Sequence, residues 1–279
     1  MRFETGLPRA DAESDFQRAR RRQVLARLGR WLRREPDDIN LILPFDEVVR
    51  ALGRTGERFL GLQTIPLDSI VGTVDRTRDF DRHFRPTTNQ ARGRWQQINL
   101  ALRRGGAMPP ISVYRVGDLH FVRDGHHRVS VAKALGHKTI DAYVTEVQTR
   151  LPADGISRRG DIVVKDYERL FRQRVPLPPE AAARIQVRDP WSYAELSESV
   201  EAWGFRLIQD LGLFLDRQEV ARRWFEDEYR PVVAMLREAD LIGAGTEAEA
   251  YLRVARERYR LIRAHAWSDE IIGRLRSGR

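Results

Sequence analysis

Most of the chemical information in this sequence lies in one stretch, which reads Val122-Arg123-Asp124-Gly125-His126-His127-Arg128-Val129-Ser130-Val131-Ala132-Lys133-Ala134-Leu135-Gly136. In its second half, Val129, Ala132 and Leu135 recur at helical spacing. Gly136 stands where a left-handed residue would end that helix. The polar residues 124–128 are therefore predicted to lie on the turn that leads into the helix.

Strands are predicted on both sides of this stretch. Residues 111–114 and 119–123 are typical of a hairpin whose turn is Gly117-Asp118, and residues 139–147 of a further strand. A strand-to-helix turn presents free backbone N–H groups and the positive end of a helix dipole. The sequence therefore predicts an anion site at residues 124–128, with phosphate as the expected anion.

Five neighbouring residues are the candidates for this site. Phosphate binding is assigned to Gly125, His126, His127 and Arg128, because glycine allows close backbone approach and arginine offers a fork of donors. Asp124 and His126 are the candidate catalytic residues, and Asp124 is also the candidate ligand of Mg²⁺ held mainly by phosphates. In the alternative interpretation, Asp124 only caps the helix, Gly125 only makes the turn, and the histidines are solvated.

A metal site is a further alternative. Alternation along the second hairpin strand places His120 and Asp124 on one face, so that they converge with His126 and His127 on a divalent ion. The spacing follows no established signature of a protein metal site.

Residues 64–147 resemble the N-terminal domain shared by chromosome-partitioning ParB proteins, sulfiredoxin and an ADP-dependent free serine kinase. The resemblance is carried by residues 63–70, by Met108-Pro109-Pro110-Ile111-Ser112-Val113 and by residues 124–128. The ParB box Gly-Glu-Arg-Arg matches Gly125 and Arg128 but neither histidine. The kinase box Asp-Gly-His-Thr-Arg matches Asp124, Gly125, His126 and Arg128. The whole chain, including residues 79–86 and the helical tail, also resembles a bacterial ParB-like family.

This resemblance implies an α+β fold, with a small ParB/sulfiredoxin-like mixed-sheet core between an N-terminal helical segment and a C-terminal helical bundle. It implies binding of a nucleotide (ATP, ADP or CTP) with Mg²⁺, in a slow NTPase or nucleotide switch associated with DNA, and a homodimer. The first alternative is a small-molecule phosphotransferase similar to the free serine kinase, with Asp124 or an acid of residues 68–81 as base. The second is a non-catalytic, partner-binding protein.

Composition limits these functions. The chain has 279 residues, 42% of them hydrophobic, and no apolar run near the roughly 20 residues that a membrane span needs. The first residues show no secretory signal, so we expect a cytoplasmic protein. Without cysteine the chain has neither a disulfide nor the cysteine chemistry of sulfiredoxin.

The distribution of charge suggests four parts: a basic helical segment (1–57), the nucleotide-binding core (58–150), a linker (151–185) and a helical domain (186–279). The core has 15 basic residues against 8 acidic ones, whereas the helical domain has 15 against 17. A basic core is suited to a polyanionic ligand. The slightly acidic tail also lacks the helix-turn-helix pattern of ParB, which argues against sequence-specific DNA binding.

A basic amphipathic helix is predicted near the N-terminus. Residues 16–34 contain eight arginines and no acid, with an apolar stripe made by Val24, Leu25, Leu28, Trp31 and Leu32. Arg20, Arg21 and Arg22 are the candidate nucleic-acid contacts, and an anionic membrane is an alternative partner. In the simplest interpretation, the stripe docks on the rest of the protein.

Two segments lie between this helix and the hairpin. Residues 75–86 are predicted to form a loop over the sheet, anchored by Phe80 and Phe84. In the alternative interpretation, this loop also closes over a ligand and supplies a carboxylate. A helix capped by Thr88 or Asn89 follows the loop. Trp95, Ile98 and Leu102 recur along that helix.

Overall fold

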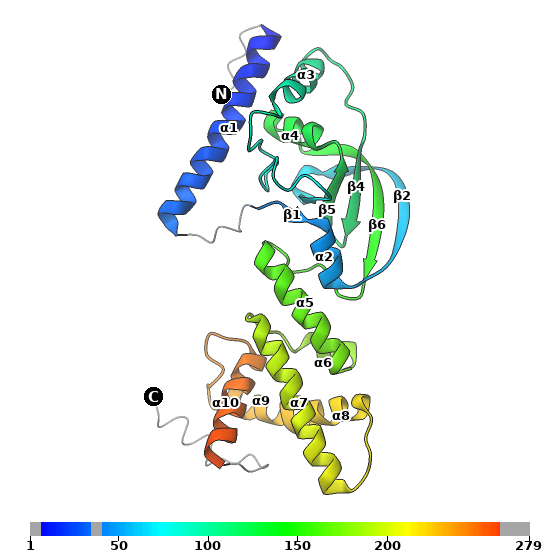
Figure 1. Cartoon of the computed structure of the whole chain (residues 1–279), viewed down its shortest axis with the longest axis vertical. Coiled ribbons are helices and arrows are strands. Elements are labelled where there is room, and N and C mark those ends of the chain that lie inside the picture. The colour runs from blue at the N-terminus through cyan, green and yellow to red at the C-terminus, as the bar shows by residue number, and fades with distance from the viewer. Residues whose placement is uncertain (1–6, 35–40, 263–279) are drawn as a thin grey trace. The chain divides into compact units, whose positions relative to one another are not determined.

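The computed structural model describes residues 7–34 and 41–262. The chain forms two compact units, Met1–Ile162 and Val163–Arg279 (Figure 1). The first unit contains both the predicted core and the basic N-terminal segment, and the boundary between the units falls inside the predicted linker. The four-part division itself stays a prediction.

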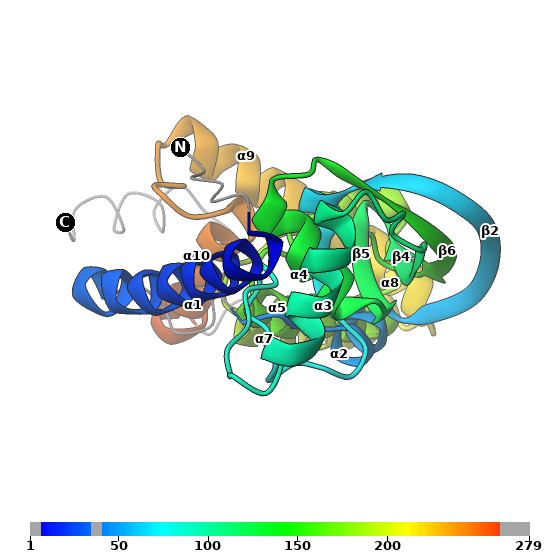
Figure 2. The same cartoon turned by 90° about the horizontal axis from the view of Figure 1, so that it is seen from above.

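A mixed sheet forms the centre of the first unit. Its strands are β1 (Leu43–Pro44), β2 (Arg54–Pro66), β3 (Ile70–Thr73), β4 (Ile111–Val116), β5 (Leu119–Asp124) and β6 (Thr139–Thr149). They lie in the order β1-β3-β5-β4-β6-β2, with β2–β6 and β4–β5 antiparallel and the other neighbours parallel. Figure 2 shows β5, β4, β6 and β2 following one another toward one edge. The predicted α+β class with a mixed sheet is confirmed.

The edge strand β2 is longer than the sequence suggests. Gly53 and Gly56 are of a residue type that favours turns, but β2 already begins at Arg54, which pairs with Thr149 of β6. Cross-strand pairing with β6 therefore outweighs the local preference of the glycines for a turn. Pro66 is the last residue of β2, as its missing N–H group predicts.

The hairpin and the helix that follows it are confirmed. A two-residue turn with Gly117 at φ 58° joins β4 to β5. The short helix α4 (His126–Leu135) follows β5 after Gly125 alone. At its end Gly136 has φ 78° and donates its N–H group to the carbonyl oxygens of Ala132 and Lys133.

Helices and a loop cover the two faces of the sheet. On one face, α2 (Phe45–Leu52) packs on apolar residues that include Val71, Val116 and Phe121. On the other face, α4 and residues 75–86 cover a cluster that includes Ile111, Val113, Val122, Val144, Phe80 and Phe84. The predicted anchoring of the loop by its two phenylalanines is thus confirmed, since both rings are buried.

Two further helices pack outside α4. They are α3 (Arg92–Arg103) and α1 (Pro8–Arg33), joined by an edge-on contact of Phe16 with Trp95 at 5.5 Å between ring centroids. Ala91 is the N-cap residue of α3 and makes no side-chain cap, so the predicted cap at Thr88 or Asn89 is wrong. The position of α3 is instead fixed by Trp95, which is buried between α1 and α4.

The apolar stripe of α1 does not dock on the described part of the protein, contrary to the simplest interpretation. Val24, Leu25, Leu28 and Leu32 are all exposed, and the side chain of Trp31 is not among those that the structure describes. The buried apolar residues of α1 are Ala12, Phe16 and Ala19, in its first half. The prediction failed because packing on α3 uses a different face of the helix from the one that the leucines mark.

The second unit is helical, which confirms the predicted C-terminal bundle. The helices from the unit boundary onward are α5 (Arg159–Arg174), α6 (Pro179–Ala183), α7 (Pro190–Leu211), α8 (Arg217–Arg223), the π-helical η3 (Trp224–Tyr229), α9 (Arg230–Glu238) and α10 (Glu247–Ile262). Trp224, Tyr229 and Tyr251 pack together at its centre. Among the described residues, no helix has the length and apolarity needed to cross a membrane.

Candidate functional site

The turn at residues 124–128 has the predicted strand-to-helix geometry. Gly125 adopts φ 104°, in the left-handed region, and no side chain caps the first N–H groups of α4. A Cβ atom on Gly125 would lie 2.4 Å from Cγ2 of Ile111. Only glycine therefore fits between β4 and the start of α4.

Asp124 and Arg128 are paired with each other. The Arg128 guanidinium donates to Asp124 Oδ2 through Nη2, at 2.5 Å, and to the carbonyl oxygens of Pro109 and Pro110 through Nη1, at 3.0 and 2.6 Å. The interpretation of Asp124 as the helix cap is therefore wrong. Arg128 thus bonds to the segment that leads into β4, and its assignment to phosphate stays a prediction.

His126 is a buried residue that faces the loop. Its side chain is 5% exposed, and Nε2 lies 2.6 Å from the hydroxyl oxygen of Thr73. Its ring stacks on Phe80 and Phe84. Burial lowers the pKa of His126 to about 4, with Asp75 acting in the opposite direction. His126 is therefore neutral near pH 7.

His127 lies beside it with its ring edge-on to Phe80, at 5.4 Å between centroids. Burial lowers the pKa of His127 as well, with the charge of Arg76 adding to the effect. Two neutral imidazoles contribute no positive charge at neutral pH. The attraction of an anion to this turn would thus depend on the backbone N–H groups rather than on the histidines.

The alternative of a converging metal site is wrong. Within residues 7–34 and 41–262, no group of three or more acidic or histidine side chains is arranged to hold a metal ion. His120 is buried in the middle of the sheet, and neither of its ring nitrogens has a hydrogen-bond partner among the residues that the structure describes. Burial lowers the pKa of His120 to about 4, followed in size by the effect of Arg115. The assignment of Asp124 to magnesium stays a prediction.

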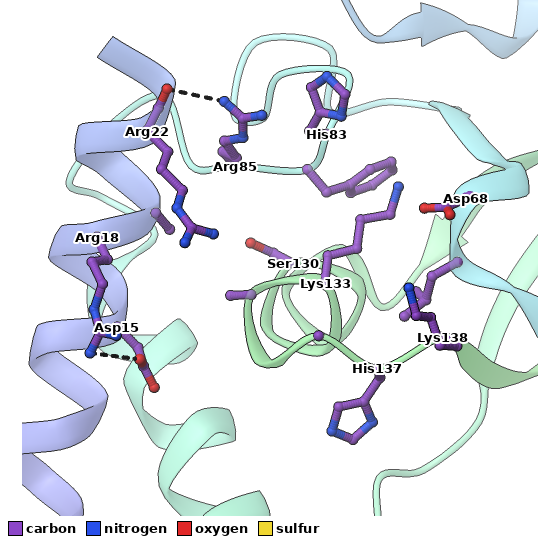
Figure 3. Close-up of a pocket in the computed structure, with 15 residues that line it drawn as sticks. Asp15, Arg18, Arg22, Asp68, His83, Arg85, Ser130, Lys133, His137 and Lys138 are labelled. Atoms are coloured by element: carbon purple, nitrogen blue, oxygen red, sulfur yellow. Dashed lines mark hydrogen bonds and ion pairs between the residues drawn. The ribbon is translucent and has the colours of Figure 1, made fainter. Parts of the chain in front are cut away.

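A cavity of about 500 Å³ lies on another face of α4 (Figure 3). Its walls come from four segments: α1, the short helix η2 (Leu67–Ser69), the loop 75–86, and α4 with the turn after it. The lining residues are Asp15, Arg18, Ala19, Arg22, Leu67, Asp68, His83, Phe84, Arg85, Ser130, Lys133, Ala134, Gly136, His137 and Lys138. None of the residues 124–128 is among them.

Basic side chains dominate this cavity. Five of its residues are cationic, namely Arg18, Arg22, Arg85, Lys133 and Lys138, against two carboxylates, Asp15 and Asp68. Arg18 pairs with Asp15 at 3.3 Å. Arg22 points into the space between α1 and α4 (Figure 3), and its guanidinium has no hydrogen bond to any residue that the structure describes. The cavity therefore offers a net positive potential and at least one cation ready for a ligand.

Lys133 extends from α4 along the wall of the cavity. Its Nζ donates to the carbonyl oxygen of Ile70 at 3.2 Å and lies 5.4 Å from the ring centroid of Phe84. Burial lowers the pKa of Lys133 to about 8, opposed by Asp68 and Asp81. The ammonium group is thus incompletely solvated. An anionic ligand beside it would stabilise its positive charge.

Hydrogen bonds hold α1 against the loop beside the cavity. Arg85 Nη1 donates to the carbonyl oxygen of Arg22 at 3.1 Å, and Arg20 Nη1 donates to the carbonyl oxygens of Pro86 and Thr87. Arg20 is thus engaged by the loop and Arg22 faces the cavity, while Arg21 is exposed. The three arginines assigned to nucleic acid do not share one surface, and their role stays a prediction.

Sequence reasoning missed this cavity although one signal was available. Only three lysines occur in the chain, and two of them, Lys133 and Lys138, line the cavity. Ser130, Lys133 and Ala134 also share one face of α4 by their spacing. The contributions of α1 and of the loop carry no local signal, because they meet α4 only in the folded chain.

Comparisons with known proteins find a distant likeness in solved structures alone. No protein-family model matches the chain, and no curated protein matches it. A C2221 crystal form of a pNOB8-like ParB N-domain shows 12% identity and a TM-score of 0.22, covering 74% of this chain and 83% of that one. A second structure of a pNOB8-like ParB N-domain shows 12% identity and a TM-score of 0.23, covering 75% and 78%.

Proposed function

We propose that this protein binds a nucleotide, through its phosphate groups, in the basic cavity between α1 and α4. The supporting observation is the convergence of five cationic side chains from three separate segments on one cavity of about 500 Å³. Ligand pockets in proteins commonly measure roughly 300–1,000 Å³, so a nucleotide fits this space. Guanidinium and ammonium groups are the usual partners of phosphate oxygens.

The proposal includes a conformational switch in which the bound nucleotide changes how tightly α1 packs on α4. The cavity is shared between α1, the loop 75–86 and α4, so a bound polyphosphate would contact all three at once. Repulsion among Arg22, Arg85 and Lys133 is then replaced by attraction to the ligand. Binding is therefore expected to tighten α1 against α4. Slow hydrolysis of ATP, ADP or CTP, a requirement for Mg²⁺, DNA association and a homodimer stay predictions.

Single substitutions of two neighbouring arginines test the proposal. Arg22→Gln should weaken binding of ATP, ADP or CTP about tenfold or more, because a hydrogen bond to a charged group contributes about 1.5–3 kcal/mol. Arg21→Gln is the matched control, since Arg21 is exposed on the same helix and does not line the cavity. Calorimetry and thermal shift, with and without Mg²⁺, give the affinities. Equal affinities of the two variants, or no binding by the native chain, would contradict the proposal.

Lys133 makes the expected binding depend on pH. Its pKa of about 8 means that its charge disappears as pH rises through that value. Nucleotide affinity should therefore fall between about pH 7.5 and pH 9, by up to about tenfold. Lys133→Arg keeps its charge and should bind with little change over this range. Identical pH profiles for the native chain and Lys133→Arg would show that Lys133 does not contact the ligand.

The stability of the unliganded protein should respond to pH in the opposite direction. The folded-state pKa of Lys133 is below its ordinary value of 10.5, so the unfolded chain binds more protons between about pH 8 and pH 10.5. Stability from this group therefore rises with pH over that window. Nucleotide affinity should therefore fall with rising pH while the stability of the unliganded protein rises, so weaker binding at high pH cannot be due to unfolding.

A phosphotransferase is the second candidate function. It is favoured by Asp68, an exposed carboxylate of η2 that lies beside the amino end of Lys133 in the cavity wall (Figure 3). A carboxylate beside a phosphate site is suited to act as general base on an acceptor hydroxyl. Transfer of labelled phosphate from ATP to free serine would distinguish this function from binding alone.

A further inference from the structure

The helix α1 has two apolar faces that point in different directions. Phe16 belongs to the buried face, whereas Leu25 and Leu32 belong to an exposed one. At about 100° per residue, Leu25 lies about 180° around the helix from Phe16, and Leu32 about 160°. The exposed stripe is therefore no continuation of the face that packs on α3. Figure 1 and Figure 2 show the second half of α1 continuing past α3 and α4.

The exposed stripe is substantial and continuous. Its members are 51–68% exposed and occupy one side of the helix: Val24 (54%), Leu25 (65%), Leu28 (51%) and Leu32 (68%). Single exposed leucines are ordinary on protein surfaces, but a stripe of four over nine residues marks an interaction surface.

The charge around this stripe has one sign only. Residues 16–34 contain eight arginines and no aspartate or glutamate. Arg21, just before the stripe, and Arg34, just after it, are both exposed. The surface thus combines an apolar centre with cationic margins.

We propose that the second half of α1 binds an anionic lipid surface, lying in its plane with the leucines inserted. An interfacial helix needs this combination of an apolar face and basic flanks, and anionic lipid headgroups carry the complementary charge. Duplex DNA would neutralise the arginines but offers no partner for four aliphatic side chains. A second copy of α1 would cover the leucines but would place arginine against arginine.

Vesicle co-sedimentation of the full chain tests this inference. Binding is expected to vesicles of phosphatidylcholine with phosphatidylglycerol and not to phosphatidylcholine alone. The double variant Leu25→Ser, Leu28→Ser should partition at least about tenfold less, because two exposed aliphatic side chains lose their insertion. The double variant Arg21→Gln, Arg34→Gln should also partition about tenfold less, because each cation near an anionic surface contributes to binding.

Leu213→Ser is the matched control. Leu213 is 62% exposed in the second unit, so its loss removes a similar apolar surface elsewhere and should leave vesicle binding unchanged. Because all these positions are exposed, thermal unfolding should show native stability for every variant. Equal binding to neutral vesicles would overturn the proposal. So would anionic-vesicle binding that the serine variant retains, or a dimer of the native chain that the serine variant abolishes.

Discussion

Gly125→Ala is expected to lower the stability of the first unit by about 4 kcal/mol, because two costs add at this position. The backbone has φ 104°, where a residue with a side chain is strained by about 1–3 kcal/mol. The new Cβ would also lie 2.4 Å from Cγ2 of Ile111, which is fully buried in β4. Forcing an atom into packed surroundings costs a further amount of about 1–3 kcal/mol.

Thermal unfolding measures this effect directly. A loss of that size should lower the melting temperature by about 10 °C, at roughly 2–4 °C per kcal/mol for a domain of this size. Gly155→Ala is the matched control, because Gly155 has φ 82° but a Cβ atom added there would have no neighbouring atom within 4 Å. Gly155→Ala should therefore lose only the stability that backbone strain costs. If both variants lose the same stability, Ile111 moves aside and the close packing of β4 on the turn is not what requires glycine.

Arg103→Met is expected to loosen α1 from the core and to weaken the ligand site. The Arg103 guanidinium lies 2.5 Å from Asp15 Oδ2 and 3.8 Å from Asp11 Oδ2, and both carboxylates are buried. Removing the cation leaves two buried carboxylates near each other. Breaking a buried pair in this way typically costs about 3–5 kcal/mol. Asp15 keeps Arg18 and the Asn99 amide, so we expect about 3 kcal/mol, near the lower end of that range.

The same variant connects stability to function. The helix α1 supplies Arg18 and Arg22 to the cavity, so a loosened α1 should reduce nucleotide affinity at temperatures where the sheet is still folded. Arg104→Met is the matched control, since Arg104 is the next residue and is exposed. Thermal unfolding and calorimetric titration of both variants check the prediction. Native affinity in a destabilised Arg103→Met protein would show that α1 does not contribute to the ligand site.

Local structure around the turn could be predicted from the residues of the turn and its neighbours. The hairpin at Gly117, the helix start after Gly125 and the helix end at Gly136 were all predictable. Each depends on the backbone freedom of glycine or on a short hydrophobic period, and both act within a few residues. The anchoring of the loop by Phe80 and Phe84 was predictable for a similar reason, because large apolar side chains in a polar segment are buried.

Which groups face a ligand depends instead on contacts between distant parts of the folded chain. Arg128, the expected phosphate contact, donates to the carbonyl oxygens of Pro109 and Pro110, and Arg22 instead enters a cavity with Lys133. The contact between α1 and the loop joins Arg85 to Arg22 across 63 positions of sequence. Side-chain donors take whichever acceptors the fold brings near, and separations of that length leave no periodic signal in the sequence. The exposure of Leu25 and Leu28 has the same origin, because it follows from the packing of the opposite face of α1.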